Sequence, residues 1–316
     1  MSNRGNVEAI QRIPSAARVS IDAKTVVRLV AENFPDLAGL PVTPVTESGW
    51  DNHTFRVGKE FKARLPASVT YISQSDKEVA WLPKLAPYIP IQIPVPVGKG
   101  RPGHGYPFHW SVWRWIDGET LNAARPGDRI ALSEDIARFL NALLRCPTNG
   151  APLAGPDNFY RGGDLGVYDQ QTRECLARLT GIIDAERLAA IWREALSTHW
   201  ERPPVWVHGD VAAGNLVMFN DKLRAVIDFG SSACGDPACD LVVNWTLFDR
   251  AAHARFRQLY NADAATWARA RGWCLWKAVL VMAENLDSES VRARELAVLN
   301  ELVSDTDHIG SGQTGK

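Results

Sequence analysis

The chain has 316 residues, of which 46% are hydrophobic and 22% are charged, and its formal net charge is -1. That composition is ordinary for a globular protein, and the length is enough for two domains or one large one. The near-neutral charge without a basic block argues against nucleic acid as a partner, and no apolar run reaches the roughly 18 residues that a membrane span needs.

The N-terminal part of the sequence alternates between helical and extended patterns. Residues 1–20 are expected to be a loose leader, without the apolar core of a targeting signal. The period-two alternation that follows is typical of an antiparallel meander. In chain order we expect a helix over 21–33 with Ser20 as its N-cap, strands over 42–46, 54–57 and 61–65, a helix over 75–85 that Pro83 kinks or ends early, an extended proline-rich linker or edge strand over 90–97, and an apolar strand over 108–115.

The C-terminal part is predominantly helical. Ser133 is the expected N-cap of the first of its helices, and a polar tail over 305–316 is expected to be mobile. The remaining pattern predicts helices over 133–144, 170–179, 185–199, 239–248, 252–260, 264–286 and 290–303.

These elements predict an α+β fold with two lobes. Residues 1–115 are expected to form an antiparallel sheet lobe with one main helix, and residues 116–316 a larger, mostly helical lobe. The boundary falls where an apolar strand ends in Asp117-Gly118 and gives way to helices. A ligand is expected in the cleft between two such lobes.

The most informative stretch is VWVHGDVAAGNLVMFNDKLRAVIDFGSSACGDPACD, residues 205–240. Two apolar strands, 216–219 and 223–227, are expected to pair through a tight turn at Asn220-Asp221. Such a hairpin places Asn215 and Asp228 at the same end of two paired strands. Asp210, which follows an earlier apolar strand, is predicted to converge with them.

Two carboxylates and an amide of this kind suit phosphoryl transfer. That reaction needs a divalent cation on the phosphates, a positive side chain near them and a base near the accepting hydroxyl. Mg²⁺ favours one or two carboxylates together with phosphate and water, which fits Asp228 with Asn215. Asp210 is then left as the base.

Other interpretations of the same residues are weaker. Cys234 and Cys239 with His208 lack the second ligand pair of a zinc site, and the five cysteines of the chain are expected to be reduced thiols of a cytoplasmic protein. A hydrolase built on Ser231-Ser232 with His208 lacks the G-x-S-x-G elbow. Taken singly, the HGD tripeptide is often only a turn, and IDFG is often only the end of a strand.

Together, however, HGDVAAGN (208–215), IDFG (227–230) and GDPACDL (235–241) resemble the catalytic, metal and following loops of the aminoglycoside phosphotransferase family. This family is the small-molecule branch of the protein-kinase-like fold. The likeness covers about residues 42–248 and implies Asp210 as catalytic base, with Asn215 and Asp228 as Mg²⁺ ligands. Asp240 resembles the acid that braces the catalytic loop. The family's second His and its Pro are Ala212 and Ala213 here, which we expect to alter loop packing only.

The N-terminal half resembles the family less sharply. The family's basic residue on the third strand matches Arg64, and the acidic partner that the family has on the next helix matches Glu78. Lys62 lies on the same strand face as Arg64 and is the alternative candidate for the basic residue. The alternative for this basic pair, and the more common outcome, is a solvated strand face.

The nucleotide-covering loop corresponds to residues 47–53, where Ser48 and Gly49 are expected to offer backbone N–H groups to phosphate. The hinge corresponds to residues 113–116. Its backbone is expected to bind the purine, with Trp113 and Trp115 alternating between cleft and core. Core packing is favoured over stacking on the base for these two tryptophans.

The resemblance implies a cytoplasmic phosphotransferase that uses Mg²⁺ and ATP or GTP to phosphorylate a hydroxyl of a small molecule, such as an aminoglycoside or another antibiotic. The alternative is a catalytically silent kinase-like protein that binds nucleotide. Neither nucleic acid nor a membrane is an expected partner, and the oligomeric state is left open. The acids that would receive a cationic acceptor are Asp157, Asp164, Asp236 and Glu284, none of which is preferred.

Overall fold

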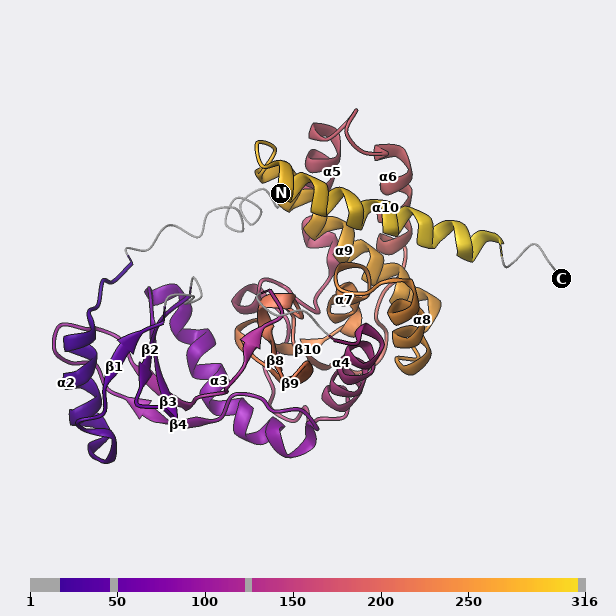
Figure 1. Ribbon diagram of the computed structural model, residues 1–316. Helices are drawn as coiled ribbons and strands as arrows, with labels where there is room; N and C mark the ends of the chain where they lie inside the picture. Colours follow the sequence, from indigo (N-terminus) through magenta and orange to yellow (C-terminus); the bar gives the residue numbers. More distant parts are fainter. Residues whose placement is uncertain (1–17, 46–50, 123–126, 312–316) are drawn as a thin grey trace. The chain divides into compact units, whose positions relative to one another are not determined.

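The computed structural model describes residues 18–45, 51–122 and 127–311, with side chains as far as Asp305 (Figure 1). The chain divides into two compact units. One comprises Met1–Arg125, Asp157–Phe159 and Gly214–Ser231, and the other comprises Pro126–Pro156, Tyr160–Ala213 and Ser232–Lys316. Across the described ranges, no helix combines the length and the apolarity that crossing a membrane requires. The division of function between residues 1–115 and 116–316 stays a prediction.

The first unit is built on a five-stranded antiparallel sheet in the order β1-β2-β3-β5-β4. This confirms the predicted meander, and it places the proline-rich segment's β4 at the edge, where a missing backbone N–H is tolerated. The strands and helices of the sheet region are β1 (Val42–Pro44), β2 (Asn52–Val57), β3 (Phe61–Pro66), β4 (Pro96–Gly100), β5 (Trp110–Arg114), α2 (Ala23–Asn33) and α3 (Ile72–Leu85).

Strand β3 shows how side chains that point alternately to the two faces of the sheet organise this unit. Ala63 and Leu65 are fully buried in the core that α2 covers, together with Val57 and Val112. Side chains at alternate positions point to the other face. Arg64 accordingly reaches Glu78 on α3. Pro83 does not end α3 early, since the helix continues to Leu85.

A second, three-stranded sheet of the same unit contains the predicted hairpin. Its strands are β6 (Glu119–Thr120), β8 (Leu216–Phe219) and β9 (Lys222–Val226), in the order β6-β8-β9. Asn220 and Asp221 both have positive φ, at 50° and 59°, as a two-residue type I′ turn requires. The backbone N–H of Ile227 donates to the carbonyl of Asn215 over 2.9 Å. The hairpin therefore brings Asn215 and Asp228 to one end, as predicted.

The second unit is helical, with one short antiparallel strand pair, β10 against β7. Helix α9 is buried along most of its length and packs against α5, α6 and α10 (Figure 1). The elements of this unit are α4 (Arg129–Leu143), α5 (Asp169–Arg178), α6 (Ala185–Leu196), β7 (Val205–Val207), β10 (Ala233–Gly235), α7 (Val243–Thr246), α8 (Arg250–Leu259), α9 (Ala264–Glu284) and α10 (Glu289–Ser311).

Both predicted N-caps are wrong. The N-cap of α2 is Asp22, whose carboxylate accepts from the backbone N–H of Thr25, and not Ser20. The N-cap of α4 is Asp128, and Ser133 lies buried within the helix with its hydroxyl donating to the Ile130 carbonyl. In each case an aspartate, two residues after Ser20 or five before Ser133, accepts from the free N–H groups of the first turn.

Two further predictions near the C-terminus need correction. The helix expected over 239–248 is a 3-10 segment, Pro237–Val242, followed by the one-turn helix α7. The tail predicted to begin at residue 305 is still helical, because α10 runs to Ser311. Asp305 anchors it by an ion pair with Arg257 at 2.7 Å. Residues 312–316 lie outside the described part.

Candidate active site

Arg64 and Glu78 form a buried ion pair in the first unit. Nη1 of Arg64 lies 2.8 Å from Oε2 of Glu78, whose residue exposure is only 2%. The other carboxylate oxygen of Glu78 accepts a hydrogen bond from the backbone N–H of Phe229 over 3.1 Å. Glu78 therefore ties strand β3 to the loop that carries Asp228.

That loop is held by α3 at a second point as well. Nζ of Lys77 donates to the carbonyl of Gly230 over 2.7 Å. Asp228 has a left-handed backbone, with φ at 67°, so the chain turns sharply where its carboxylate leaves the strand end. Asn215 lies at the same end of the hairpin, and the assignment of these two residues as Mg²⁺ ligands stays a prediction.

Charges in this part of the first unit perturb one another. Burial raises the pKa of Asp51 to about 6, and the negative charge of Asp228 adds to the effect. Burial also lowers the pKa of Lys62 to about 8, assisted by the positive charge of Arg64. Lys62 and Arg64 are both partly buried, so they do not form a fully solvated strand face, and it is Arg64 that pairs with Glu78.

The two hinge tryptophans have different surroundings. Trp113 is fully buried, and its indole N–H donates to the hydroxyl of Ser111 over 2.7 Å. Trp115 is half-buried beneath the guanidinium of Arg56, which lies 3.7 Å from its ring centroid. Its backbone N–H donates to the Glu60 carbonyl. The structure thus favours core packing for Trp113. The predicted phosphate contacts of Ser48 and Gly49 fall outside the described residues.

In the second unit, the HGD segment is braced by Asp240. Its two carboxylate oxygens accept from the backbone N–H groups of His208 and Gly209, each over 2.7 Å. Asp240 and His208 are both buried, with exposures of 3% and 0%. The resemblance implied that Asp240 braces this loop, and these hydrogen bonds fix the backbone immediately before Asp210.

Asp210 itself is half-buried and forms an ion pair with Lys277 of α9, with Oδ1 and Nζ 2.8 Å apart. Burial alone raises the pKa of Asp210, but the ammonium of Lys277 outweighs it, helped by Arg161. The pKa is consequently held below its ordinary value. Asp210 is thus an ionised carboxylate near neutral pH, as a proton acceptor must be.

Sequence reasoning missed Lys277. It lies 67 residues after Asp210, on a helix that is buried on nearly every side. Its signal was a single lysine in the otherwise apolar run WCLWKAVLVM. A charged residue in such a run is rarely buried without a partner, which was reason to look for one.

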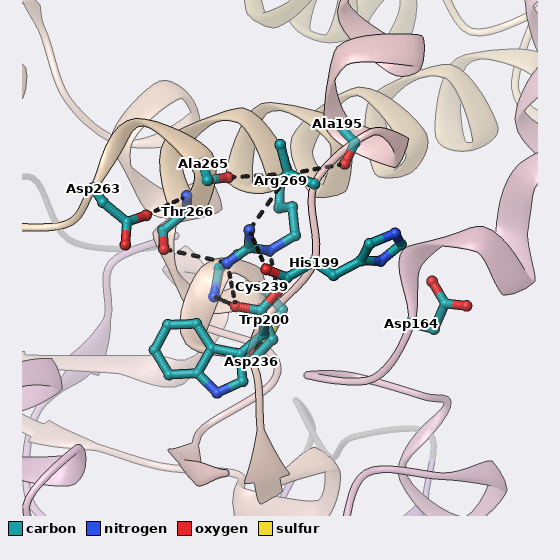
Figure 2. A network of polar contacts seen from close by, with 12 residues as sticks. Asp164, Ala195, His199, Trp200, Asp236, Cys239, Asp263, Ala265, Thr266 and Arg269 are labelled. Atoms are coloured by element: carbon teal, nitrogen blue, oxygen red, sulfur yellow. Dashed lines mark hydrogen bonds and ion pairs between the residues drawn. The ribbon is translucent and has the colours of Figure 1, made fainter. Parts of the chain in front are cut away.

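The acids proposed to receive a cationic acceptor have other surroundings. Asp236 is 5% exposed and pairs with the equally buried Arg269, whose Nε lies 2.7 Å from Oδ2 (Figure 2). Its carboxylate is therefore committed to the structure. Asp164 is exposed and accepts from the backbone N–H of Gly166. Asp157 and Glu284 are exposed.

In one unit, against the effect of burial, the negative charges of Glu78 and Asp228 thus raise the pKa of Arg64. Asn215 lies at the same end of the hairpin as Asp228. In the other unit the structure gathers Asp210, Asp240 and Lys277. The convergence of Asp210 with Asn215 and Asp228 stays a prediction.

Comparison with known proteins gives a family and a fold. The model of the phosphotransferase enzyme family matches residues 42–273. A search of curated proteins finds no match. The solved GDP complex of aminoglycoside 2'-phosphotransferase-IIIa is similar at a TM-score of 0.66 and 18% identity, over 90% of this chain and 100% of that one.

The macrolide 2'-phosphotransferase MphH of Brachybacterium faecium is similar at a TM-score of 0.57 and 18% identity, over 88% of this chain and 98% of its own. The streptomycin–ATP ternary complex of APH(2")-IIa is similar at a TM-score of 0.55 and 18% identity, over 90% of this chain and 97% of that one. These likenesses confirm the predicted α+β, protein-kinase-like fold class. The family match covers most of the chain, and the chain therefore belongs to the phosphotransferase enzyme family that its HGD and IDFG loops indicated.

Proposed function

We propose that this protein transfers the γ-phosphate of ATP or GTP to a hydroxyl of a small molecule, with Asp210 as the base. The family match supports phosphotransfer as the reaction class. The ionised state of Asp210 beside Lys277 supports the base. The two halves of the proposed machinery are joined by the chain itself, since Asn215 lies only five positions after Asp210.

In this proposal the first unit binds the nucleotide and the metal. Asn215 and Asp228 would hold Mg²⁺, which supplies charge neutralisation at the phosphates. Arg64 would bind phosphate oxygens, and its position is set by Glu78. The donor set fits, because the two side chains offer one carboxylate and one neutral oxygen, leaving room for phosphate oxygens and water.

The second unit would supply the base. Asp210 accepts the proton of the attacking hydroxyl as the oxygen forms its bond to the γ-phosphorus, and the nucleoside diphosphate leaves. Asp240 keeps the preceding backbone in place through its two hydrogen bonds. Lys277 keeps Asp210 ionised before the hydroxyl arrives, so that the base does not have to lose a proton first.

The remaining assignments stay part of the proposal. Ser48 and Gly49 would cover the phosphates, and the backbone of residues 113–116 would bind the purine. We place the reaction in the cytoplasm, which agrees with all five cysteines being buried free thiols. Antibiotics are the first acceptors to test, because the solved relatives include complexes with kanamycin, gentamicin and streptomycin.

The observation that carries the proposal is the ionised Asp210, held between the Asp240-braced HGD turn and Lys277. Its test has two parts. Mg-ATP or Mg-GTP should raise the melting temperature, and chelation of Mg²⁺ should abolish the shift. Nucleoside diphosphate should then form in proportion to phosphorylated acceptor. A nucleotide-dependent shift without turnover on any acceptor would indicate the silent binding protein instead.

A further inference from the structure

A small pocket lies beside Asp210 within the second unit. Its volume is about 20 Å³, which is room for little more than one small group. Its lining includes Arg161, Asp210, Trp273 and Lys277. Among the described residues that line it, Asp210 is the single acid, and it faces two cations. The pocket is thus positive in net charge even with the base ionised.

The place of Arg161 is set by its backbone. The next residue, Gly162, accepts a hydrogen bond at its carbonyl from the Asp236 N–H over 2.7 Å. The approach is so close that a Cβ on Gly235 would lie 2.0 Å from the same carbonyl oxygen. The loop therefore cannot move away from β10 without breaking this contact, and the contact fixes the position of the backbone that carries the Arg161 side chain.

The side chain of Arg161 extends over aromatic rings. Its guanidinium carbon lies 4.4 Å from the ring centroid of Trp276 and 5.6 Å from that of Trp273. Trp276 is fixed in turn, because its indole N–H donates to Gln171 and Tyr168 stacks on it at 4.0 Å. Aromatic faces of this kind bind cationic ligands in many proteins. Here the chain's own guanidinium lies over them.

Apart from Asp210, the described residues that line the pocket include no carboxylate that would receive a polycation. Asp236 is committed to Arg269, and Asp164 to the turn that begins at residue 165. Neither these two nor Asp157 nor Glu284 lines this pocket. A ligand amine entering it would meet Arg161 and Lys277, and like charges at such range repel.

We propose that the acceptor carries an anionic group close to the hydroxyl that is phosphorylated, and that Arg161 together with Lys277 binds this group. The guanidinium suits a carboxylate or a phosphate through paired N–H donors. Polycationic aminoglycosides are then poor acceptors. This inference rests on the proposed function and narrows its substrate class.

The test is a screen of the full-length protein with Mg-ATP and Mg-GTP against three sets of hydroxylated compounds. The sets are anionic (uronic acids, hydroxy acids and sugar phosphates), neutral (sugars and alcohols) and cationic (amino sugars and aminoglycosides). We expect kcat/KM for the best anionic acceptor to exceed that for the best cationic one at least tenfold. Comparing carboxylate with phosphate members identifies which anion is preferred.

Variants of Arg161 make the test specific. Arg161→Glu should reverse the preference by tenfold or more, Arg161→Gln should raise the acceptor KM about tenfold while the nucleotide KM stays within twofold, and Arg161→Lys should restore part of the loss. Arg193→Glu is the matched charge reversal, because Arg193 is exposed on α6 and does not line the pocket. It should leave the preference unchanged.

The outcomes separate the two proposals. A wild-type preference for aminoglycosides, an unchanged preference in Arg161→Glu, or a raised nucleotide KM in Arg161→Gln would overturn the inference and leave phosphotransfer intact. Absence of turnover on all three sets would contradict the proposed function, and the inference would fall with it.

Discussion

Two ion pairs of the same length, 2.8 Å, lie in the two units and have different surroundings. The side chains of Arg64 and Glu78 are 13% and 1% exposed, whereas those of Lys277 and Asp210 are 40% and 35% exposed. A buried pair is costly to break, since removing one partner leaves a charge without solvent. A half-exposed pair is screened and can exchange partners at little cost. The first pair is suited to hold the structure, and the second to exchange protons and ligands.

The largest effect on turnover is expected at Asp210, the carboxylate of the half-exposed pair. Asp210→Asn removes the proton acceptor with almost no change in shape. Turnover should fall by about 10²–10⁴-fold, the usual contribution of a general base. Nucleotide binding, measured by thermal shift, should be retained. Full turnover in Asp210→Asn would show that the base is another residue.

The buried pair should affect stability instead. Glu78→Ala leaves Arg64 without its partner and the Phe229 N–H without its acceptor. We expect a loss of about 3–5 kcal/mol in the free energy of unfolding by denaturant titration. The control is Glu60→Ala, because Glu60 pairs with Arg114 on the surface, at side-chain exposures of 72% and 55%. That variant should lose less than about 1 kcal/mol. Equal losses in the two variants would contradict the assignment of Glu78.

Asp240→Asn tests the brace before Asp210. The amide keeps one acceptor oxygen but turns an N–H₂ group toward a backbone donor, so one buried N–H, of His208 or Gly209, loses its partner. The cost should be about 1–3 kcal/mol of stability. Turnover should fall with it, because the base is displaced. Asp221→Asn in the exposed hairpin turn is the control, and a similar loss there would argue against the brace.

Lys277→Met should give the smallest loss of stability and a diagnostic change in pH dependence. Lys277 lowers the pKa of Asp210 against the opposing effect of burial. Without the ammonium the pKa of Asp210 rises, because burial is then opposed only by the weaker effects of Arg161 and His208, so the base is protonated at higher pH. The acidic limb of the kcat/KM profile should therefore move to higher pH. Lys222→Met, an exposed lysine on β9, should leave the profile in place. An unmoved limb in Lys277→Met would mean that the ion pair does not set the charge of Asp210.

The sequence predicted the pairs that local spacing determines. The Asn220-Asp221 turn fixes the register that pairs Asn215 with Ile227, whereas the Arg64–Glu78 pair was predicted from the resemblance to the family. The hairpin follows from strand periodicity and turn chemistry within a short segment.

What the sequence could not provide depends on contacts between distant segments. Lys277 contacts Asp210 only because α9 is packed in the interior of the second unit. The hydrophobic periodicity of a helix that is buried on nearly every side does not indicate which of its residues faces a given loop. Asp305 likewise continues α10 past the predicted end through its pair with Arg257. The N-caps failed for a local reason, since both Ser20 and Asp22 are good caps and propensity alone does not choose between them.

The central claim is tested most directly by following the γ-phosphate itself. Labelled at that position, ATP or GTP with Mg²⁺ should deliver the label to the hydroxyl of an acceptor, one equivalent for each nucleoside diphosphate formed, and Asp210→Asn should slow the transfer by about 10²–10⁴-fold. If the label remains in the nucleotide or appears only as inorganic phosphate across the whole acceptor panel, while the wild-type protein binds nucleotide, the phosphotransfer account is contradicted.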